Sequence, residues 1–89
     1  MIRKRYVFHG QVQHVGFRWR ARRAAEMFGC TGRCGNNPDG SVTMEIQGSG
    51  VKIGLVLLAI RTGRRIRIRK TEVSVIEPVP EEKGFTSEY

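Results

Sequence analysis

Apolar residues recur at helical spacing in two stretches of the chain. Across residues 18–28 they fall at positions i, i+3, i+4 and i+7, which make one face of a helix, and Gly29 follows as a stop signal. A second helix is expected between Ser49, which can cap it, and Gly63, which can end it. The buried faces should carry Ala21, Ala24, Ala25 and Phe28 in the first helix and Ile53, Val56, Leu57 and Ile60 in the second.

Alternating or short apolar runs that are bounded by turn residues predict the strands. Residues 37–40, Asn-Pro-Asp-Gly, favour a turn, so the runs on either side of them should form a hairpin. After residue 63 the apolar phase shifts between Ile68 and Val73, which indicates a β-bulge near Lys70 and Thr71. The strands are expected at residues 6–8, 30–36, 41–47 and 64–76, with a possible short fifth strand at residues 85–89.

The resulting order is β-α-β-β-α-β, which predicts an α+β fold of the ferredoxin-like, split βαβ kind. Two helices then cover one face of an antiparallel sheet. With 89 residues the chain should form a single domain, residues 1–89. Such a domain buries roughly two thirds of its unfolded surface and cannot enclose a large cofactor. A small ligand at a loop or at a helix end is therefore the expected kind of site.

The net charge of +8 points to an anionic ligand, either a small phosphate or a nucleic acid. Thirteen of the sixteen Lys and Arg residues fall in two blocks. The longest apolar run, residues 55–60, is too short to span a bilayer, and no apolar segment follows the basic start, so a cytoplasmic protein without a membrane partner is expected. The blocks are Arg3, Lys4, Arg5, Arg18, Arg20, Arg22 and Arg23, then Arg61, Arg64, Arg65, Arg67, Arg69 and Lys70.

The two cysteines, Cys30 and Cys34, are expected on one strand, about 13 Å apart. A disulfide needs Cα atoms within about 7 Å, so free thiols and a reducing compartment are expected. The strand geometry and the lack of a second ligand pair also argue against a zinc site. Neither a metal nor a cofactor is expected.

The loop before the first helix has the features of an anion site. Free backbone N–H groups and the helix dipole attract negative charge to a helix N-terminus, and successive amides from His14 to Arg18 can form a concave nest. Gly16 lets the backbone approach a ligand closely. Arg18, expected as the first helical residue, can grip two phosphate oxygens at once.

Two segments resemble the signatures of the acylphosphatase family. Residues 10–18, Gly-Gln-Val-Gln-His-Val-Gly-Phe-Arg, closely resemble G-x-V-Q-G-V-G-F-R. Residues 32–42, Gly-Arg-Cys-Gly-Asn-Asn-Pro-Asp-Gly-Ser-Val, are similar to G-W-V-x-N-x-x-D-G-S-V. The spacing between the segments and the ending at residues 84–89 fit as well, so the likeness covers essentially the whole chain.

The resemblance implies hydrolysis of acyl phosphates without a metal or a covalent intermediate. It implies that Arg18 holds the phosphate and that Asn36 orients the attacking water. The amides of His14, Val15, Gly16 and Phe17 would bind phosphate oxygens. The partner would be a small phosphorylated substrate or inorganic phosphate, and the protein would be a monomer. The chain departs from the family pattern at His14, which replaces Gly, at Arg33, which replaces Trp, and at Gly35, which precedes Asn36.

Two other functions remain open on the sequence. One is a catalytically weak, acylphosphatase-like module that binds an anion or a protein. The other is an RNA-binding module, because RNA-binding sheets use the same element order. Those sheets display aromatic residues on their two central strands, whereas residues 41–47 contain none, so nucleic acid is the less expected partner.

Overall fold

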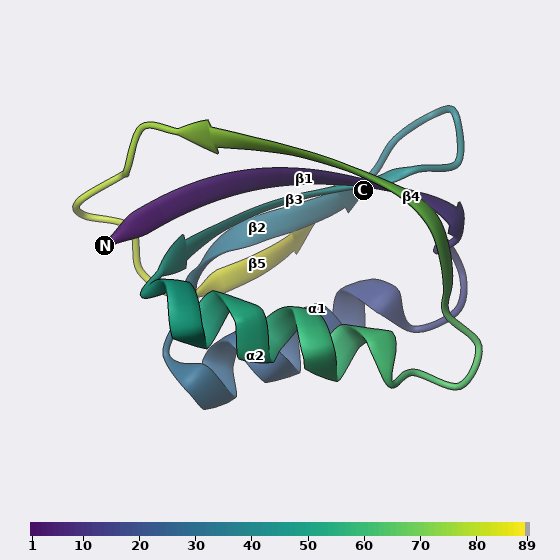
Figure 1. Cartoon of the computed structure of the whole chain (residues 1–89), viewed down its shortest axis with the longest axis horizontal. Helices are drawn as coiled ribbons and strands as arrows, with labels where there is room; N and C mark the ends of the chain where they lie inside the picture. The colour runs from purple at the N-terminus through teal and green to yellow at the C-terminus, as the bar shows by residue number, and fades with distance from the viewer. Residues whose placement is uncertain (89) are drawn as a thin grey trace.

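The computed structural model describes residues 1–88. Two helices lie against one face of a five-stranded sheet (Figure 1). The expected ferredoxin-like fold is confirmed, including the fifth strand. The elements are β1 (Ile2–Gln11), α1 (Phe17–Phe28), β2 (Thr31–Asn36), β3 (Val42–Gly48), α2 (Gly50–Arg61), β4 (Arg67–Ile76) and β5 (Phe85–Glu88).

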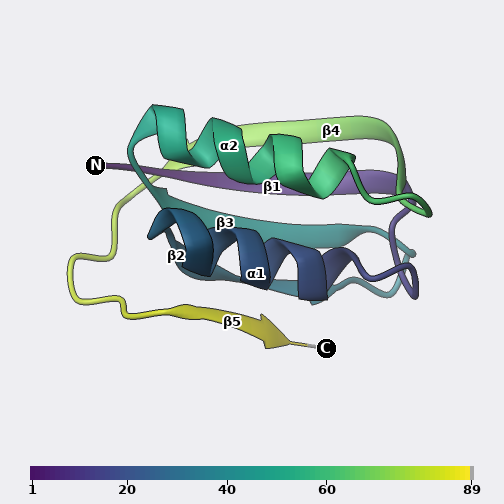
Figure 2. The same ribbon diagram turned by 90° about the horizontal axis from the view of Figure 1, so that it is seen from below.

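The strand order in the sheet is β4-β1-β3-β2-β5. The first four strands pair antiparallel, but β5 runs parallel to β2, so the sheet is mixed rather than wholly antiparallel. Figure 2 shows α2 on the β4 side of the sheet and α1 on the β5 side. The strand order leaves β4 and β5 at the two edges of the sheet. The loop from β1 to α1 meets the end of β2, where Gln13 bonds to the carbonyl of Asn37.

The core lies between the helices and the sheet. Phe8 packs against Phe17 with the rings tilted by 52° and their centroids 5.0 Å apart, which joins β1 to the first residue of α1. Ser49 caps α2 by accepting a hydrogen bond from the backbone N–H of Lys52, as expected. The predicted helix faces are buried at Ala21, Ala24, Ala25, Ile53, Val56 and Ile60, with Phe28 and Leu57 half-buried against the core.

Several predicted bounds differ from the structure. The first strand extends well beyond residues 6–8 in both directions because β1 is a central strand that pairs with β3 and β4. The last long strand begins at Arg67 instead of residue 64. The β-bulge is one residue earlier than expected: His9 pairs with Lys70 and Gly10 with Ile68, which leaves Arg69 as the extra residue.

The cysteines do not share a strand as expected. Cys34 lies in β2, but Cys30 comes just before that strand begins. The backbone N–H of Cys30 bonds to the carbonyl of Ala25, so Cys30 belongs to the turn that ends α1. Both cysteines are free and buried. Within residues 1–88, no group of three His, Cys, Asp or Glu residues is placed to hold a metal ion, and neither helix is long and apolar enough to cross a membrane.

Candidate active site

The loop from β1 to α1 carries two residues in the left-handed region. His14 has φ 60° and Gly16 has φ 81°, and Gly16 is the N-cap of α1. Because Gly16 caps the helix, α1 begins at Phe17, and Arg18 is its second residue instead of its first. Within residues 1–88, the backbone N–H groups of His14, Val15 and Gly16 donate no hydrogen bond. They are therefore available to an external acceptor.

The side chain of Arg18 reaches across to β5. Its Nη1 donates to the backbone carbonyl of Glu88 at 2.9 Å and to the hydroxyl of Ser87 at 3.5 Å. Its charge also acts on the thiol of Cys34 in β2. Burial raises the pKa of that thiol to about 12, and the nearby Arg18 charge offsets the rise only in part. Cys34 is therefore a neutral thiol at physiological pH, which suits packing and not nucleophilic attack.

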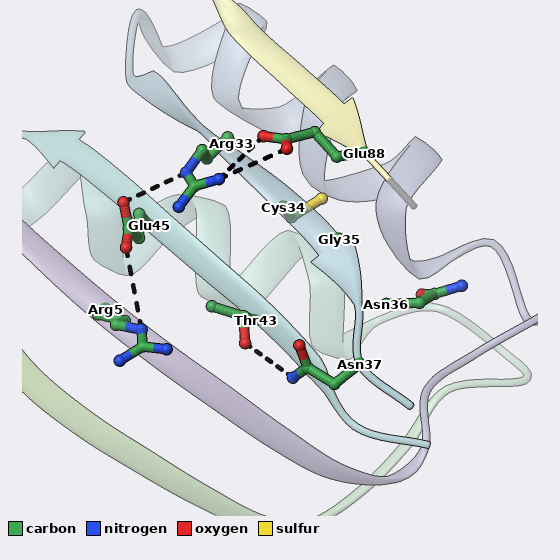
Figure 3. Close-up of a pocket in the computed structure, with 9 residues that line it drawn as sticks. All are labelled: Arg5, Arg33, Cys34, Gly35, Asn36, Asn37, Thr43, Glu45 and Glu88. Carbon is green, nitrogen blue, oxygen red and sulfur yellow. Dashed lines mark hydrogen bonds and ion pairs between the residues drawn. The ribbon is translucent and has the colours of Figure 1, made fainter. Parts of the chain in front are cut away.

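Asn36 is the last residue of β2 and pairs with Val42 of β3. Its side-chain Oδ1 is buried and has no hydrogen-bond partner among the described residues. The side chains of Asn36 and Asn37 point in opposite directions (Figure 3). A buried acceptor without a partner costs about 1–3 kcal/mol, so its retention calls for an explanation.

Gln13 joins the loop to the turn that follows Asn36. Its Nε2 donates to the carbonyl of Asn37 at 2.8 Å and to the carbonyl of Ser41 at 2.9 Å. No role for Gln13 was predicted from the sequence. The signal was present, because Gln13 is one of the residues shared with the first family signature, but no local pattern indicates that its amide crosses to the β2–β3 turn.

The turn itself is held by its own side chains. Asn37 donates to the hydroxyls of Ser41 and Thr43 at 2.9 Å and 2.8 Å. The carboxylate of Asp39 accepts from the backbone N–H and the hydroxyl of Ser41. These bonds hold the pKa of Asp39 below its usual value. The end of β2 is thus braced on the side that Gln13 contacts.

Arg33 takes part in an ion-pair network on the sheet face opposite the helices. It contacts Glu45 at 3.4 Å and Glu88 at 3.2 Å, and Arg5 contacts Glu45 at 3.8 Å (Figure 3). Together with Gly35, Asn36 and Thr43, these side chains line a hollow of about 200 Å³. Two carboxylates therefore offset the charge that Arg33 brings in place of Trp.

A second hollow adjoins the other side of the loop. Val15 and Gly16 line it together with Trp19 and three arginines, and its volume is about 220 Å³. The arginines are Arg20 of α1 and Arg64 and Arg65 of the second basic block. Part of the second basic block, to which the sequence assigned no contact, therefore lies beside the loop. The structure brings positive charge from residues far along the chain to the start of α1.

The fold and the loop define a ferredoxin-like domain with backbone amides before a helix N-terminus that have no acceptor among residues 1–88. A model of the acylphosphatase family matches residues 4–87. The chain is 34% identical to the acylphosphatase of Lactobacillus johnsonii over 77 residues, which cover 86% of this chain and 84% of that protein. It is 46% identical to the acylphosphatase of Mycolicibacterium smegmatis over 55 residues, or 62% of this chain and 56% of that protein.

The chain also shares its fold with the crystal structure of acylphosphatase from Bacillus subtilis. The TM-score is 0.89 at 23% identity, and the match covers 100% of both chains. The chain belongs to the acylphosphatase family, as its two sequence segments indicated. At the level of the family, this confirms the expectation of an acylphosphatase enzyme.

Proposed function

We propose that this chain hydrolyses acyl phosphates to a carboxylate and inorganic phosphate. In this proposal Arg18 and the amides of the loop hold the phosphate, and Asn36 orients the attacking water. The loop amides are those of His14, Val15, Gly16 and Phe17.

The observation that carries the proposal is the buried, unpartnered Oδ1 of Asn36. An amide oxygen accepts a hydrogen bond and its NH₂ group donates, so Asn36 can hold a water in a fixed orientation, but it cannot take the proton. The Oδ1 has almost no accessible surface in this structure, so the side-chain amide would have to turn for it to accept from a bound water, which would then be its missing partner. The role of Asn36 is therefore positioning, which lowers the entropic part of the barrier.

In the proposal, the loop amides and Arg18 hold the phosphate together. The amides of His14, Val15 and Gly16 have no acceptor among residues 1–88, and that of Phe17 is in the first turn of α1, where the helix dipole favours an anion. A guanidinium carries five N–H groups in a planar fork that suits phosphate oxygens, and the Nη1 of Arg18 bonds to β5 in this structure. Arg18 and the amides together neutralise the charge that develops on the phosphoryl oxygens.

The reaction needs no further catalytic group. The oxygen of the water forms a bond to phosphorus, and the bond between phosphorus and the acyl oxygen breaks. The electron pair leaves with the carboxylate, which is a weak base, so no strong general acid is required. The proton of the water passes to a phosphate oxygen of the substrate. Metal-independent turnover follows from this scheme.

The experiment is hydrolysis of benzoyl phosphate in excess EDTA by the wild type, Arg18→Ala and Asn36→Ala. We expect Asn36→Ala to lower kcat about 100-fold or more, since one positioned catalytic contact is worth a few kcal/mol. Arg18→Ala should lose turnover and also weaken inhibition by inorganic phosphate. Arg22→Ala is the matched control, because Arg22 is an exposed α1 arginine that pairs with Glu26.

The proposal fails if the folded wild type has no turnover in EDTA, or if Asn36→Ala retains it. A protein that binds phosphate through Arg18 without turnover would instead be an anion-binding module.

RNA binding through the sheet has little support. The sheet face opposite the helices would have to present aromatic side chains on β1 and β3. The aromatic residues of β1, Tyr6 and Phe8, are buried, and β3 has none. The residues of β1 on the open face include Arg3 and Arg5, which pair with Glu45 instead.

A further inference from the structure

The strand β4, Arg67–Ile76, is ten residues long and lies at an edge of the sheet. Within residues 1–88, no strand pairs with its outer side. An edge of this length exposes a row of backbone N–H and C=O groups that another extended segment can pair with. Natural edges are commonly protected by charge or by proline. In β4 the charged residues are concentrated in the first half, and the strand contains no proline.

A basic cleft lies along the first half of β4, between that strand and the end of α2. Its volume is about 680 Å³. Four cationic residues line it over an apolar floor, and no carboxylate of residues 1–88 does. Glu72, the acidic residue of β4, is engaged by His9 at 2.6 Å. The cationic residues are Arg61, Arg67, Arg69 and Lys70, and the apolar ones are Ile66 and Ile68.

The bulge helps to build this cleft. Arg69 is the extra residue of β4, so it and Lys70 do not alternate across the sheet as two regular strand residues would, and both line the cleft. Gly10 is required opposite the bulge, because a Cβ on it would overlap the carbonyl oxygen of Arg67. The backbone geometry of the bulge therefore helps to place Arg69 and Lys70 on the same cationic surface.

The second half of β4 is apolar and exposed. Val73 and Val75 are 54% and 73% exposed, and they stand opposite Tyr6 and Lys4 of β1. Because Tyr6 is buried on the helix-covered side of the sheet, the two valines belong to that side too. Leu58 of α2, which runs along the same side of the molecule (Figure 2), is 61% exposed. One strand edge thus combines a basic half with an apolar half.

We propose that β4 is a docking edge for an extended, acidic segment of a partner protein. The segment pairs with the outer backbone of β4, places its carboxylates in the cleft of Arg61, Arg67, Arg69 and Lys70, and covers Val73 and Val75 with its apolar residues. Charge complementarity identifies the occupant, because the cleft combines four cations with no anion from the described part of the chain. This proposal concerns a surface separate from the loop and does not depend on the proposed hydrolysis.

A second copy of the chain fits this edge poorly. In antiparallel pairing about a two-fold axis, the basic half of one β4 would face the apolar half of the other, so neither charge nor apolar surface is matched. Nucleic acid also fits poorly. Single strands bind by stacking bases on aromatic side chains, and none of the residues of α2 or β4 is aromatic.

The probe is a fluorescent ten-residue peptide with four glutamates in one half and alternating valine and threonine in the other, measured by anisotropy. We expect Arg61→Ser/Arg69→Ser to weaken its binding about tenfold or more, which is about 1.4 kcal/mol or more. The matched control, Arg22→Ser/Arg23→Ser, removes the same charge from exposed α1 positions and should change the affinity less than about twofold. Hydrolysis by Arg61→Ser/Arg69→Ser should equal that of the wild type.

Peptide variants test the strand pairing separately from the charge. N-methylation of alternate peptide amides should abolish binding for one set and spare it for the other, because only one set faces β4. Hydrogen exchange of the amides in Arg67–Ile76 should slow when the unmodified peptide binds.

Four results would each overturn the proposal. The first is that a peptide with lysines in place of glutamates binds as tightly as the acidic peptide, and the second is that both N-methylated peptides bind equally well. The third is that an oligouridine binds more tightly than the peptide and displaces it. The fourth is that the protein forms a dimer that the peptide does not dissociate.

Discussion

The side-chain amide of Gln13, in the loop from β1 to α1, donates to the backbone carbonyl of Asn37 in the β2–β3 turn at 2.8 Å. Asn36 directly precedes Asn37, and its buried Oδ1 lacks a partner among residues 1–88. Gln13 therefore sets the position of the loop relative to Asn36. The proposed hydrolysis needs both parts at a fixed separation, because the water and the phosphate must meet in line.

Gln13→Ala should lower kcat/KM for benzoyl phosphate by about 10-fold to 100-fold, because a shift of about 1 Å in a catalytic group costs this much. Loss of the two hydrogen bonds should also cost about 1–2 kcal/mol of unfolding free energy in urea. The inhibition constant for inorganic phosphate separates positioning from stability alone: it should rise in Gln13→Ala. Gln11→Ala is the control, since Gln11 makes one exposed bond, to the carbonyl of Arg65. Unchanged phosphate inhibition in Gln13→Ala would leave Gln13 with a structural role only.

His14→Gly should stabilise the protein. Among residues 1–88, His14 is the one non-glycine residue with positive φ, and the left-handed conformation costs an L-residue about 1–2 kcal/mol. Glycine removes this strain but gains entropy in the unfolded chain, so the net gain should be about 0.5–1 kcal/mol in urea unfolding. Val15→Gly, at the neighbouring residue without positive φ, should destabilise instead.

The same variant tests the part that His14 plays at the loop. Its backbone N–H and not its imidazole is the proposed phosphate ligand, so His14→Gly should keep kcat within about threefold, less than about 1 kcal/mol in the barrier. A much larger loss would assign a contact to the imidazole.

Gly32→Ala should be among the most damaging substitutions in β2. Gly32 has φ 149°, and a Cβ there would overlap the carbonyl oxygen of Glu45 in β3. We expect a loss of roughly 3 kcal/mol or more of unfolding free energy, from strain and from the disturbed β2–β3 pairing. Gly40→Ala is the matched control: Gly40 also has positive φ, 93°, but a Cβ there meets nothing within 4 Å. Equal losses in the two variants would show that the overlap with Glu45 contributes nothing.

Glu45 should make the protein sensitive to acid. Burial raises the pKa of its carboxyl, but hydrogen bonds from Arg3 and Arg33 outweigh this effect and hold the pKa below the usual 4.5. A depressed pKa in the folded state contributes stability that is present above about pH 4.5 and is lost as the pH falls through the folded value. Glu45→Gln should therefore be less stable at pH 7 and should show a smaller loss of stability below about pH 4.5.

The control for this measurement is Glu26→Gln, which alters an exposed pair with Arg22. Its urea midpoint should follow the wild type across the same pH range. If Glu45→Gln lost as much stability as the wild type when the pH falls below about 4.5, Glu45 would not be a cause of the acid sensitivity. Arg3, which is 3% exposed, would keep Glu82 at 2.7 Å as its partner in this variant.

The sequence predicted the order of elements because the signals involved are local. Ser49 caps its own helix three residues away, and the spacing of Ala21, Ala24 and Ala25 is set by one helix turn. Strand bounds were predicted less well. The basic start of β1 has no apolar alternation, yet Arg3 is buried because Glu45 and Glu82 lie beside it, and these partners are far along the chain.

The candidate site divides in the same way. The two signatures determined the family and named Arg18, Asn36 and the loop, because those residue types stand at fixed positions in the chain. Only the tertiary structure decided that Gln13 contacts a turn 24 residues away and that Arg18 bonds to a strand 70 residues away. It also decided that Arg64 and Arg65 adjoin the loop and that β4 is left at an edge. Such contacts depend on how the strands order themselves in the sheet, which is settled by burial and pairing over the whole chain and leaves no local pattern in the sequence.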